Sequence, residues 1–182
     1  MAEESTGIRI AGLGGQGVVL TGLLLGHAAV HDGFYAAGSS SYGAQSRGSL
    51  CKSEVVVSRA PIDYPHVELA NLFVAMSQEG YDAYASRIVE GGHVFYDTGL
   101  VSGLRGNRDE TGFDVTATSM NVLKDKQAAN MIWAGILAGA TVWFSERSLE
   151  EAIRTHLPER FLDLNLRALK IGILLGRDWK ER

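Results

Sequence analysis

The stretch Ile8-Arg9-Ile10-Ala11-Gly12-Leu13-Gly14-Gly15-Gln16-Gly17 decides the fold, because it reads as a short strand that ends in a glycine-rich turn. The apolar segment 18–30 that follows has the length of a helix. Gly12, Gly14 and Gly17 satisfy the pattern G-x-G-x-x-G. In a strand–turn–helix setting, the backbone N–H groups of such a turn and the helix dipole can receive a phosphate. The stretch therefore predicts the opening of a Rossmann-like domain.

Short apolar segments separated by helix-length segments continue this pattern. We expect further strands at 34–37, 50–59, 72–76, 93–96 and 113–116, and helices at 78–89 after the cap Ser77, at 127–140, from the capping box at Ser148, and at 159–175 before the C-cap Gly176. Segment 50–59 follows 34–37 without room for a crossover helix, so those two strands are expected to be antiparallel. The fold class is α/β: a single three-layer α/β/α Rossmann-like domain over residues 1–182, with a mixed, mostly parallel sheet of about six strands.

Composition excludes several classes of function. The formal net charge of −4 and the absence of a basic stripe argue against nucleic-acid binding. The acidic, polar N-terminal segment is unlike a signal peptide, which predicts a cytoplasmic protein. The longest apolar stretch, 131–144, is shorter than the ~18 residues that a membrane span needs, so we expect a buried helix and no membrane role.

The glycine-rich turn is open to several interpretations. Dinucleotide binding also needs an acidic residue about 20 residues further on, to hold the ribose hydroxyls. Gly38 and Ser39 stand in that region, and Asp32 comes before the second strand. NAD or FAD is therefore a weak alternative. The glycines could instead serve only a tight turn and close helix packing, or bind another phosphate-bearing ligand, or dock the backbone of a partner.

A second candidate is the small, polar segment 38–48, which we interpret as an ordered functional loop. Ser41, Tyr42 and Arg47 combine a hydroxyl, an aromatic face and a guanidinium, which suits an anion or a planar ring. The loop would lie near the first turn if both follow strands at the same edge. The alternatives are a solvated surface loop and a contact with another subunit.

Other reactive residues do not form a recognisable catalytic or metal site. The five histidines show no metal-ligand spacing, and no nucleophile–base pair can be assigned. The single cysteine, Cys51, lies in a predicted strand and cannot supply the roughly four thiolates of an iron–sulfur cluster. We therefore predict no catalytic residue and no metal ligand in this chain.

Several motifs together resemble one known family. They are Gly12-Leu13-Gly14-Gly15-Gln16-Gly17, Ser41-Tyr42-Gly43-Ala44-Gln45-Ser46-Arg47-Gly48, Val74-Ala75-Met76-Ser77-Gln78-Glu79 and Lys126-Gln127-Ala128-Ala129-Asn130. In this order they resemble the gamma subunit of 2-oxoacid:ferredoxin oxidoreductases, over nearly the whole chain. Segments 52–57 and 62–65 are most similar to the 2-oxoglutarate branch, within a family that also includes pyruvate and ketoisovalerate enzymes.

The resemblance implies a subunit of an enzyme that converts a 2-oxoacid and coenzyme A to an acyl-CoA, carbon dioxide and reduced ferredoxin. It places thiamine diphosphate, magnesium and iron–sulfur clusters on partner alpha and beta subunits and a ferredoxin-like delta subunit. This chain alone would bind no cofactor and be inactive. The residues expected to contact coenzyme A phosphates or partner subunits are Gly12, Gly14, Gly15, Gln16, Gly17, Ser41, Tyr42 and Arg47.

Two other functions stay open at this point. One is a free-standing nucleotide-binding module or NAD-dependent oxidoreductase. The other is a purely structural subunit.

Overall fold

The computed structural model describes residues 5–43, 48–106 and 109–181. Its strands are β1 (Ser5–Leu13), β2 (Tyr35–Tyr42), β3 (Leu50–Ser58), β4 (Ala70–Ala75), β5 (Ile88–Asp97) and β6 (Asp109–Phe113). The helices are α1 (Val18–His31), α2 (Gln78–Tyr84), α3 (Val115–Thr118), α4 (Ala129–Ala140), α5 (Glu146–His156) and α6 (Leu162–Lys180), with short turns η1 (Ser119–Leu123), η2 (Lys126–Ala128) and η3 (Glu159–Phe161). Among these described residues, no helix has both the length and the apolar character needed to cross a bilayer.

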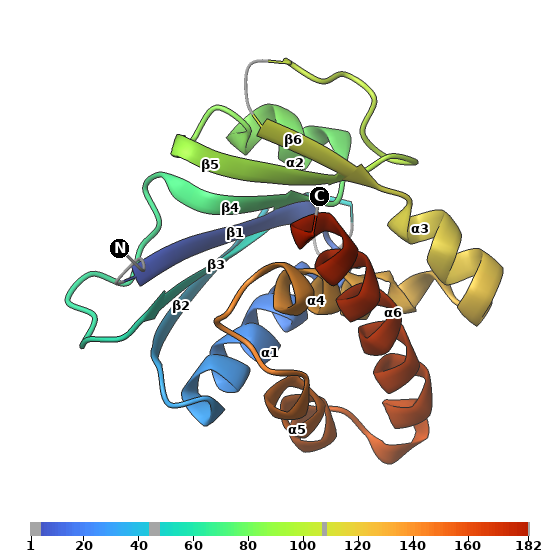
Figure 1. Ribbon diagram of the computed structural model, residues 1–182. Coiled ribbons are helices and arrows are strands. Elements are labelled where there is room, and N and C mark those ends of the chain that lie inside the picture. The colour runs from blue at the N-terminus through green and yellow to red at the C-terminus, as the bar shows by residue number, and fades with distance from the viewer. Residues whose placement is uncertain (1–4, 44–47, 107–108, 182) are drawn as a thin grey trace.

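The strands form one mixed sheet in the order β2-β3-β1-β4-β5-β6 (Figure 1). Neighbours β1 and β4, β4 and β5, and β5 and β6 are parallel, whereas β3 is antiparallel to both β1 and β2. Helices α1, α4, α5 and α6 cover one face, and α2 covers the other (Figure 1). This confirms the predicted three-layer α/β/α fold with a mixed, mostly parallel sheet, including the antiparallel strand over 50–58.

Helix α4 comes from the apolar stretch that the sequence assigns to a buried helix, and it is buried on all sides. It crosses α6 at glycines. A Cβ at Gly135 would lie 2.2 Å from the carbonyl oxygen of Leu169, and one at Gly172 would lie 2.0 Å from that of Ile132. The two backbones therefore touch directly. Gly176 belongs to the same crossing and does not cap α6 as predicted, because the helix continues to Lys180.

Three predicted boundaries are wrong because strand pairing overrides local pattern. The helix predicted over 78–89 ends at Tyr84, since Ile88 already pairs with β4. The strand predicted at 113–116 begins earlier in the structure, since Asp109 and Glu110 already pair with β5 as part of β6. The strand predicted at 113–116 correspondingly ends at Phe113 and gives way to α3.

The predicted loop 38–48 is also partly a strand. Residues up to Tyr42 pair with β3 in an unbroken register, so β2 is longer than the apolar pattern indicates. Small polar side chains carry no apolar signal, but an edge strand needs only one hydrogen-bonded neighbour. In the C-terminal part, α5 begins at Glu146 with Ser145 as its N-cap, one turn before the predicted capping box.

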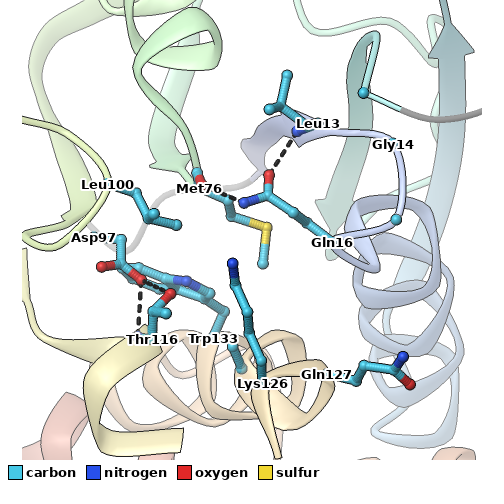
Figure 2. A pocket seen from close by; sticks show the side chains of 13 residues that line it. Leu13, Gly14, Gln16, Met76, Asp97, Leu100, Thr116, Lys126, Gln127 and Trp133 are labelled. Carbon is cyan, nitrogen blue, oxygen red and sulfur yellow. Dashed lines mark hydrogen bonds between the residues drawn. The ribbon is translucent and has the colours of Figure 1, made fainter. Parts of the chain in front are cut away.

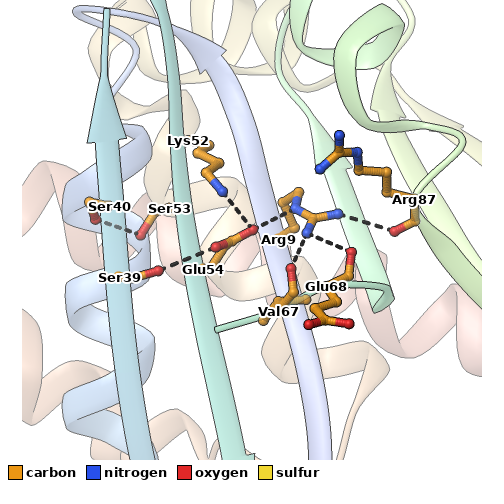
Figure 3. A network of polar contacts seen from close by, with 9 residues as sticks. All are labelled: Arg9, Ser39, Ser40, Lys52, Ser53, Glu54, Val67, Glu68 and Arg87. Atoms are coloured by element: carbon orange, nitrogen blue, oxygen red, sulfur yellow. Dashed lines mark hydrogen bonds and ion pairs between the residues drawn. The ribbon is translucent and has the colours of Figure 1, made fainter. Parts of the chain in front are cut away.

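A buried charge network lies on the face that α2 covers (Figure 3). Arg9 of β1 and Glu54 of β3 are 1% and 2% exposed, and the Arg9 Nε donates to Glu54 Oε1 at 2.8 Å. The Arg9 guanidinium also donates to the carbonyl oxygens of Val67, Glu68 and Arg87. This arginine therefore joins β3 and the segments that lead into β4 and β5 to the central strand.

The carboxylate has further partners. Lys52 Nζ lies 3.0 Å from Glu54 Oε1, and the Ser39 hydroxyl donates to Oε2 at 3.2 Å. Burial by itself would raise the pKa of Glu54, but the hydrogen bonds and charges of Arg9 and Lys52 outweigh it and lower that pKa. The charged pair is consequently the stable form at neutral pH.

We expect Glu54→Ala to lower the free energy of unfolding by about 3–5 kcal/mol, because it leaves the buried Arg9 charge without its counter-ion. Lys52→Ala, which removes a partly exposed partner, should cost less than about 1 kcal/mol. Urea unfolding of both variants checks the difference. Because the folded-state pKa of Glu54 is lowered, its stabilisation is present above the ordinary carboxyl pKa and is lost as the pH falls through the folded value. Equal effects of the two substitutions would contradict this assignment.

The helix crossing offers a second stability test. Gly172→Ala should destabilise the protein by more than about 2 kcal/mol, because the new methyl group would overlap the backbone of α4. Gly26→Ala on α1 is the matched control, since a Cβ there meets nothing within 4 Å. It should stabilise the protein by about 0.5–1 kcal/mol through helix propensity. Thermal unfolding measures both, and a neutral Gly172→Ala would refute the close crossing.

Candidate functional site

The carboxyl ends of β1 and β4 meet at the point where the sheet's connections diverge. From β1 the chain runs through α1 toward β2 and β3, and from β4 it runs through α2 toward β5 on the other side. In open α/β sheets, ligands bind in the crevice at this kind of switch point. A cavity of about 460 Å³ lies here (Figure 2). Its lining residues are Leu13, Gly14, Gly15, Gln16, Gly48, Met76, Asp97, Leu100, Thr116, Lys126, Gln127, Ala129 and Trp133.

The glycine-rich turn forms one wall and requires glycine for steric reasons. A Cβ at Gly12 would lie 2.4 Å from the side-chain oxygen of Gln16 and 2.9 Å from Cβ of Met76. Gly15 and Gly17 have φ values of +100° and +75°, in the left-handed region that other residues rarely adopt. The predicted strand–turn–helix geometry is therefore present.

The side chain of Gln16 fastens this turn. Its Oε1 accepts a hydrogen bond from the Leu13 N–H at 2.6 Å, and its Nε2 donates to the carbonyl oxygen of Met76 at 2.7 Å (Figure 2). Both ends of the amide are thus used within the protein. The turn is held against the end of β4, and Gly14 and Gly15 line the cavity beside it.

Two charged residues line the cavity. The Asp97 carboxylate is 1% exposed and accepts hydrogen bonds from the Gly99 N–H at 2.9 Å and from the N–H and hydroxyl of Thr116 at 2.9 and 2.7 Å. It therefore holds the start of α3 in place. Lys126 is exposed and extends from η2 toward Met76 and Gln16 (Figure 2). Among the described lining residues it is the only cation.

The remaining wall is apolar, formed by Leu13, Met76, Leu100 and Trp133. Helix α1 begins at the far side of the turn with Gly17 as its N-cap and without a side-chain cap, so no side chain neutralises the positive end of its dipole. The arrangement combines an apolar surface, one ammonium group and a glycine turn. It suits a ligand that carries both apolar and anionic parts.

The second predicted site segment, residues 38–48, lies only partly near this cavity. Ser41 and Tyr42 lie exposed on the edge strand β2 and line none of the cavities described here, and Arg47 lies outside the described residues. The end of the β2–β3 connection does meet the turn, because the Gly14 N–H donates to the carbonyl oxygen of Ser49 at 2.9 Å. The expectation that the two segments lie at one edge is therefore correct.

Asp32, which was considered from the sequence as a ligand for a ribose, has a structural role. It caps α1, and its carboxylate accepts hydrogen bonds from the N–H and hydroxyl of Ser145 at 2.6 and 2.7 Å and from the Ser148 hydroxyl at 2.5 Å. These bonds join α1 to the start of α5. The side chain is thereby engaged away from the glycine turn, which removes the acidic partner that dinucleotide binding needs.

Cys51 is buried on the core side of β3, and burial raises the pKa of its thiol. Such a thiol is poorly ionised and therefore a weak nucleophile. In the part of the chain that the structure describes, no three histidine, cysteine or acidic side chains are grouped to hold a metal ion.

Sequence reasoning from the residues gave no site role to Lys126, Asp97 or Trp133. Lys126 stands directly before the helix predicted at 127–140, but nothing local indicates that this helix starts beside the first turn. Asp97 ends a strand whose carboxyl edge faces the same crevice. The position of Asp97 at a strand end could have indicated a site residue, because sites at the switch point of a sheet are formed by residues at the ends of its strands.

The fold and the cavity define an α/β protein with a ligand-sized site at the switch point of its sheet. The chain belongs to the pyruvate ferredoxin/flavodoxin oxidoreductase family, whose family model matches residues 7–175. The resemblance seen in its motifs is thereby confirmed.

Individual relatives agree with this assignment. The 2-oxoglutarate synthase subunit KorC of Methanocaldococcus jannaschii is 37% identical over 94% of this chain and 94% of its own length. The solved gamma subunit of a keto/oxoacid ferredoxin oxidoreductase from Geobacter sulfurreducens has a TM-score of 0.86 at 32% identity, over 97% of this chain and 98% of that one. The 2-oxoglutarate:ferredoxin oxidoreductase of Magnetococcus marinus, solved with 2-oxoglutarate, coenzyme A and succinyl-CoA, shares the fold over 97% of this chain and 32% of its own, with a TM-score of 0.86 and 21% identity.

Proposed function

We propose that this chain is the gamma subunit of a 2-oxoglutarate:ferredoxin oxidoreductase and that it helps to bind coenzyme A in the assembled enzyme. The assembled enzyme would convert 2-oxoglutarate and coenzyme A to succinyl-CoA and carbon dioxide and reduce ferredoxin. Full-length similarity to a 2-oxoglutarate synthase subunit supports the subunit role and the substrate. The single-domain organisation of residues 1–182 stays part of this proposal.

The donor groups of this chain do not fit the redox cofactors of such an enzyme. An iron–sulfur cluster takes about four thiolates, whereas the sequence has one cysteine, and that one is buried. The sequence also lacks a Gly-Asp-Gly segment followed by paired asparagines, with which thiamine enzymes hold magnesium and diphosphate. We therefore assign thiamine diphosphate, magnesium and the clusters to alpha, beta and ferredoxin-like delta subunits.

Lys126 is the observation that carries the coenzyme A proposal. Its ammonium extends into a cavity whose opposite wall is the glycine turn, so an anion placed between them meets a full positive charge and the Gly15 N–H, which donates to no other described residue. The apolar wall suits the uncharged pantetheine arm. The volume of about 460 Å³ is typical of small-molecule sites, which span about 300–1,000 Å³.

In this proposal the chain binds and orients coenzyme A and carries out no covalent step. Gly12, Gly14, Gly15 and Gly17 shape the phosphate-binding turn, and Gln16 holds it rigid. Ser41, Tyr42 and Arg47 stay predicted contacts to coenzyme A or to a partner subunit. A purely structural subunit is the competing function, and it differs in one respect: it would leave the affinity for coenzyme A independent of Lys126.

The subunit role predicts that the tagged chain, expressed with its companion subunits, purifies with two larger polypeptides. The purified complex should reduce ferredoxin with 2-oxoglutarate and coenzyme A, while the chain alone shows no turnover. Gel filtration followed by a spectrophotometric reduction assay measures both. Turnover of a 2-oxoacid by the isolated chain would refute the role.

The binding role predicts a selective effect of Lys126→Ala in the assembled complex. Loss of one charge-assisted hydrogen bond, worth about 1.5–3 kcal/mol, should raise the KM for coenzyme A about 10- to 100-fold. The kcat should change little, because the lost contact binds substrate and transition state alike. The KM for 2-oxoglutarate should also stay constant.

Lys170→Ala is the matched control, because it removes the same charge from an exposed pair with Glu150 on the helical side of the molecule. It should leave all steady-state constants unchanged. If Lys126→Ala behaves like this control, the structural-subunit alternative replaces the coenzyme A proposal.

A further inference from the structure

The two edge strands of the sheet differ in how they are protected against pairing with other chains. Strand β6 is five residues long and begins with the acidic pair Asp109 and Glu110. Strand β2 is eight residues long, and its sequence Tyr-Ala-Ala-Gly-Ser-Ser-Ser-Tyr contains neither a charged residue nor a proline. Short length, charged side chains and proline are the features that keep edge strands of soluble proteins unpaired. Strand β2 lacks all three, so its edge is open to another strand.

The register of β2 shows which of its backbone groups are free. The Gly43 N–H donates to the carbonyl oxygen of Leu50, so these two residues form a hydrogen-bonded pair at the end of the β2–β3 ladder. Because such pairs alternate along an antiparallel ladder, the backbone groups of residues 35, 37, 39 and 41 bond to β3. The backbone groups that point away from β3, and that pair with no described backbone group, belong to Ala36, Gly38, Ser40 and Tyr42.

These outward groups are complementary to the same groups of a second copy. An antiparallel pairing centred on Ser39 places Gly38 opposite Ser40 of the second copy, and Ala36 opposite Tyr42 of the second copy. Every outward-pointing residue of β2 then lies in a pair that exchanges two backbone hydrogen bonds. No like charges meet, because the strand is uncharged, and the Tyr42 ring, which is 69% exposed, covers a small alanine.

Helix α1, which packs against β2 and β3, carries a second feature at this edge (Figure 1). Gly22 faces β3, and the Thr21 hydroxyl reaches the first turn of α4. Helical spacing places Leu23, Gly26 and Val30 together on the side of α1 opposite α4. Leu23 and Val30 are 44% and 59% exposed, and a Cβ at Gly26 would meet nothing within 4 Å. This side of α1 is therefore an unpartnered apolar stripe beside the free edge of β2.

The pairing of the two strands brings the two stripes together. A two-fold axis perpendicular to the joined sheets keeps both α1 helices on the same face, one on each side of the axis. The stripe of one copy then faces the stripe of the other, and Gly26 lets the helices approach closely. Exposed apolar residues that are grouped on one surface mark interaction sites. The backbone edge and the helix stripe are thus satisfied by the same occupant.

We propose that β2 and the stripe Leu23-Gly26-Val30 form an interface between two copies of this chain, which joins their sheets into one continuous sheet. This inference is independent of coenzyme A binding. It agrees with the sequence-based alternative that segment 38–48 contacts another subunit, and it makes that subunit a second copy of the chain. In the assembled enzyme, the contact links two complexes through their gamma subunits.

Disulfide crosslinking tests the register, on the purified full chain and on the assembled complex. Ser39→Cys places two thiols at the two-fold axis, where facing Cα atoms lie about 4.5 Å apart, which is within disulfide range. Mild oxidation should therefore give a covalent dimer on a non-reducing gel. Ser41→Cys is the matched control, because residue 41 is more exposed, yet its two copies lie about 14 Å apart along the strands and should not crosslink. The native Cys51 is buried.

Gel filtration with light scattering measures the association itself. The wild-type chain should have twice its monomer mass of 19.6 kDa. Ser40→Pro removes one outward N–H from each copy, at a position where an edge strand tolerates proline, and should raise the dissociation constant of the dimer at least about 30-fold. Ser40→Ala keeps this N–H and should leave the dimer intact.

The helix stripe has its own variant. Leu23→Glu places two like charges in the stripe and should dissociate the dimer, whereas Leu174→Glu on α6, at a leucine that is 65% exposed, should not. A wild-type chain that is monomeric and a Ser39→Cys variant that crosslinks in neither preparation would overturn the interface. Equal crosslinking of Ser39→Cys and Ser41→Cys would also overturn it, because random collision would then explain both. Each of these results leaves the coenzyme A proposal standing.

Discussion

The buried charge of Arg9 is the constraint on which the arrangement of the strands depends. A guanidinium in the middle of the central strand, 1% exposed, must be neutralised and hydrogen-bonded where it lies. Glu54 supplies the counter-charge from the antiparallel neighbour, and the carbonyl oxygens of Val67, Glu68 and Arg87 supply the remaining acceptors. One side chain thereby fixes β3 and the entries to β4 and β5 relative to β1. The carboxyl ends of β1, β4 and β5 then meet to form the cavity.

In two places glycines let two backbone segments lie in direct contact. At the turn after β1, glycines let the chain pass Met76 and Asn130 without a side chain between them, and Gln16 closes the gap with its amide. At the crossing of α4 and α6, glycines on both helices bring the backbones into contact. Both approaches position the start of α4 beside the turn. Lys126 and Asn130 consequently reach the two sides of the same stretch of glycine backbone.

The distribution of chemical groups explains why such a chain works as part of an assembly. Its one thiol is buried and poorly ionised, and both Asp97 beside the cavity and Asp32 at the far end of α1 are engaged in hydrogen bonds that hold helices. What stays available at the cavity is a small set of binding groups, namely the Gly15 N–H and the ammonium of Lys126. Such a set can hold and orient a substrate, whereas electron transfer needs groups that other polypeptides provide.

The sequence by itself determined the order of strands and helices, the three-layer class and the glycine turn, because apolar periodicity and glycine spacing report on local conformation. Its motifs also identified the family. Tertiary structure alone decided where β2 and α2 end, since strand pairing extends through the polar residues up to Tyr42 and begins again at Ile88. It also decided that Gly176 packs against α4 and that Lys126 faces the turn, because both depend on contacts between segments far apart in the chain. Local sequence carries no record of such partners, which exist only once the core has formed.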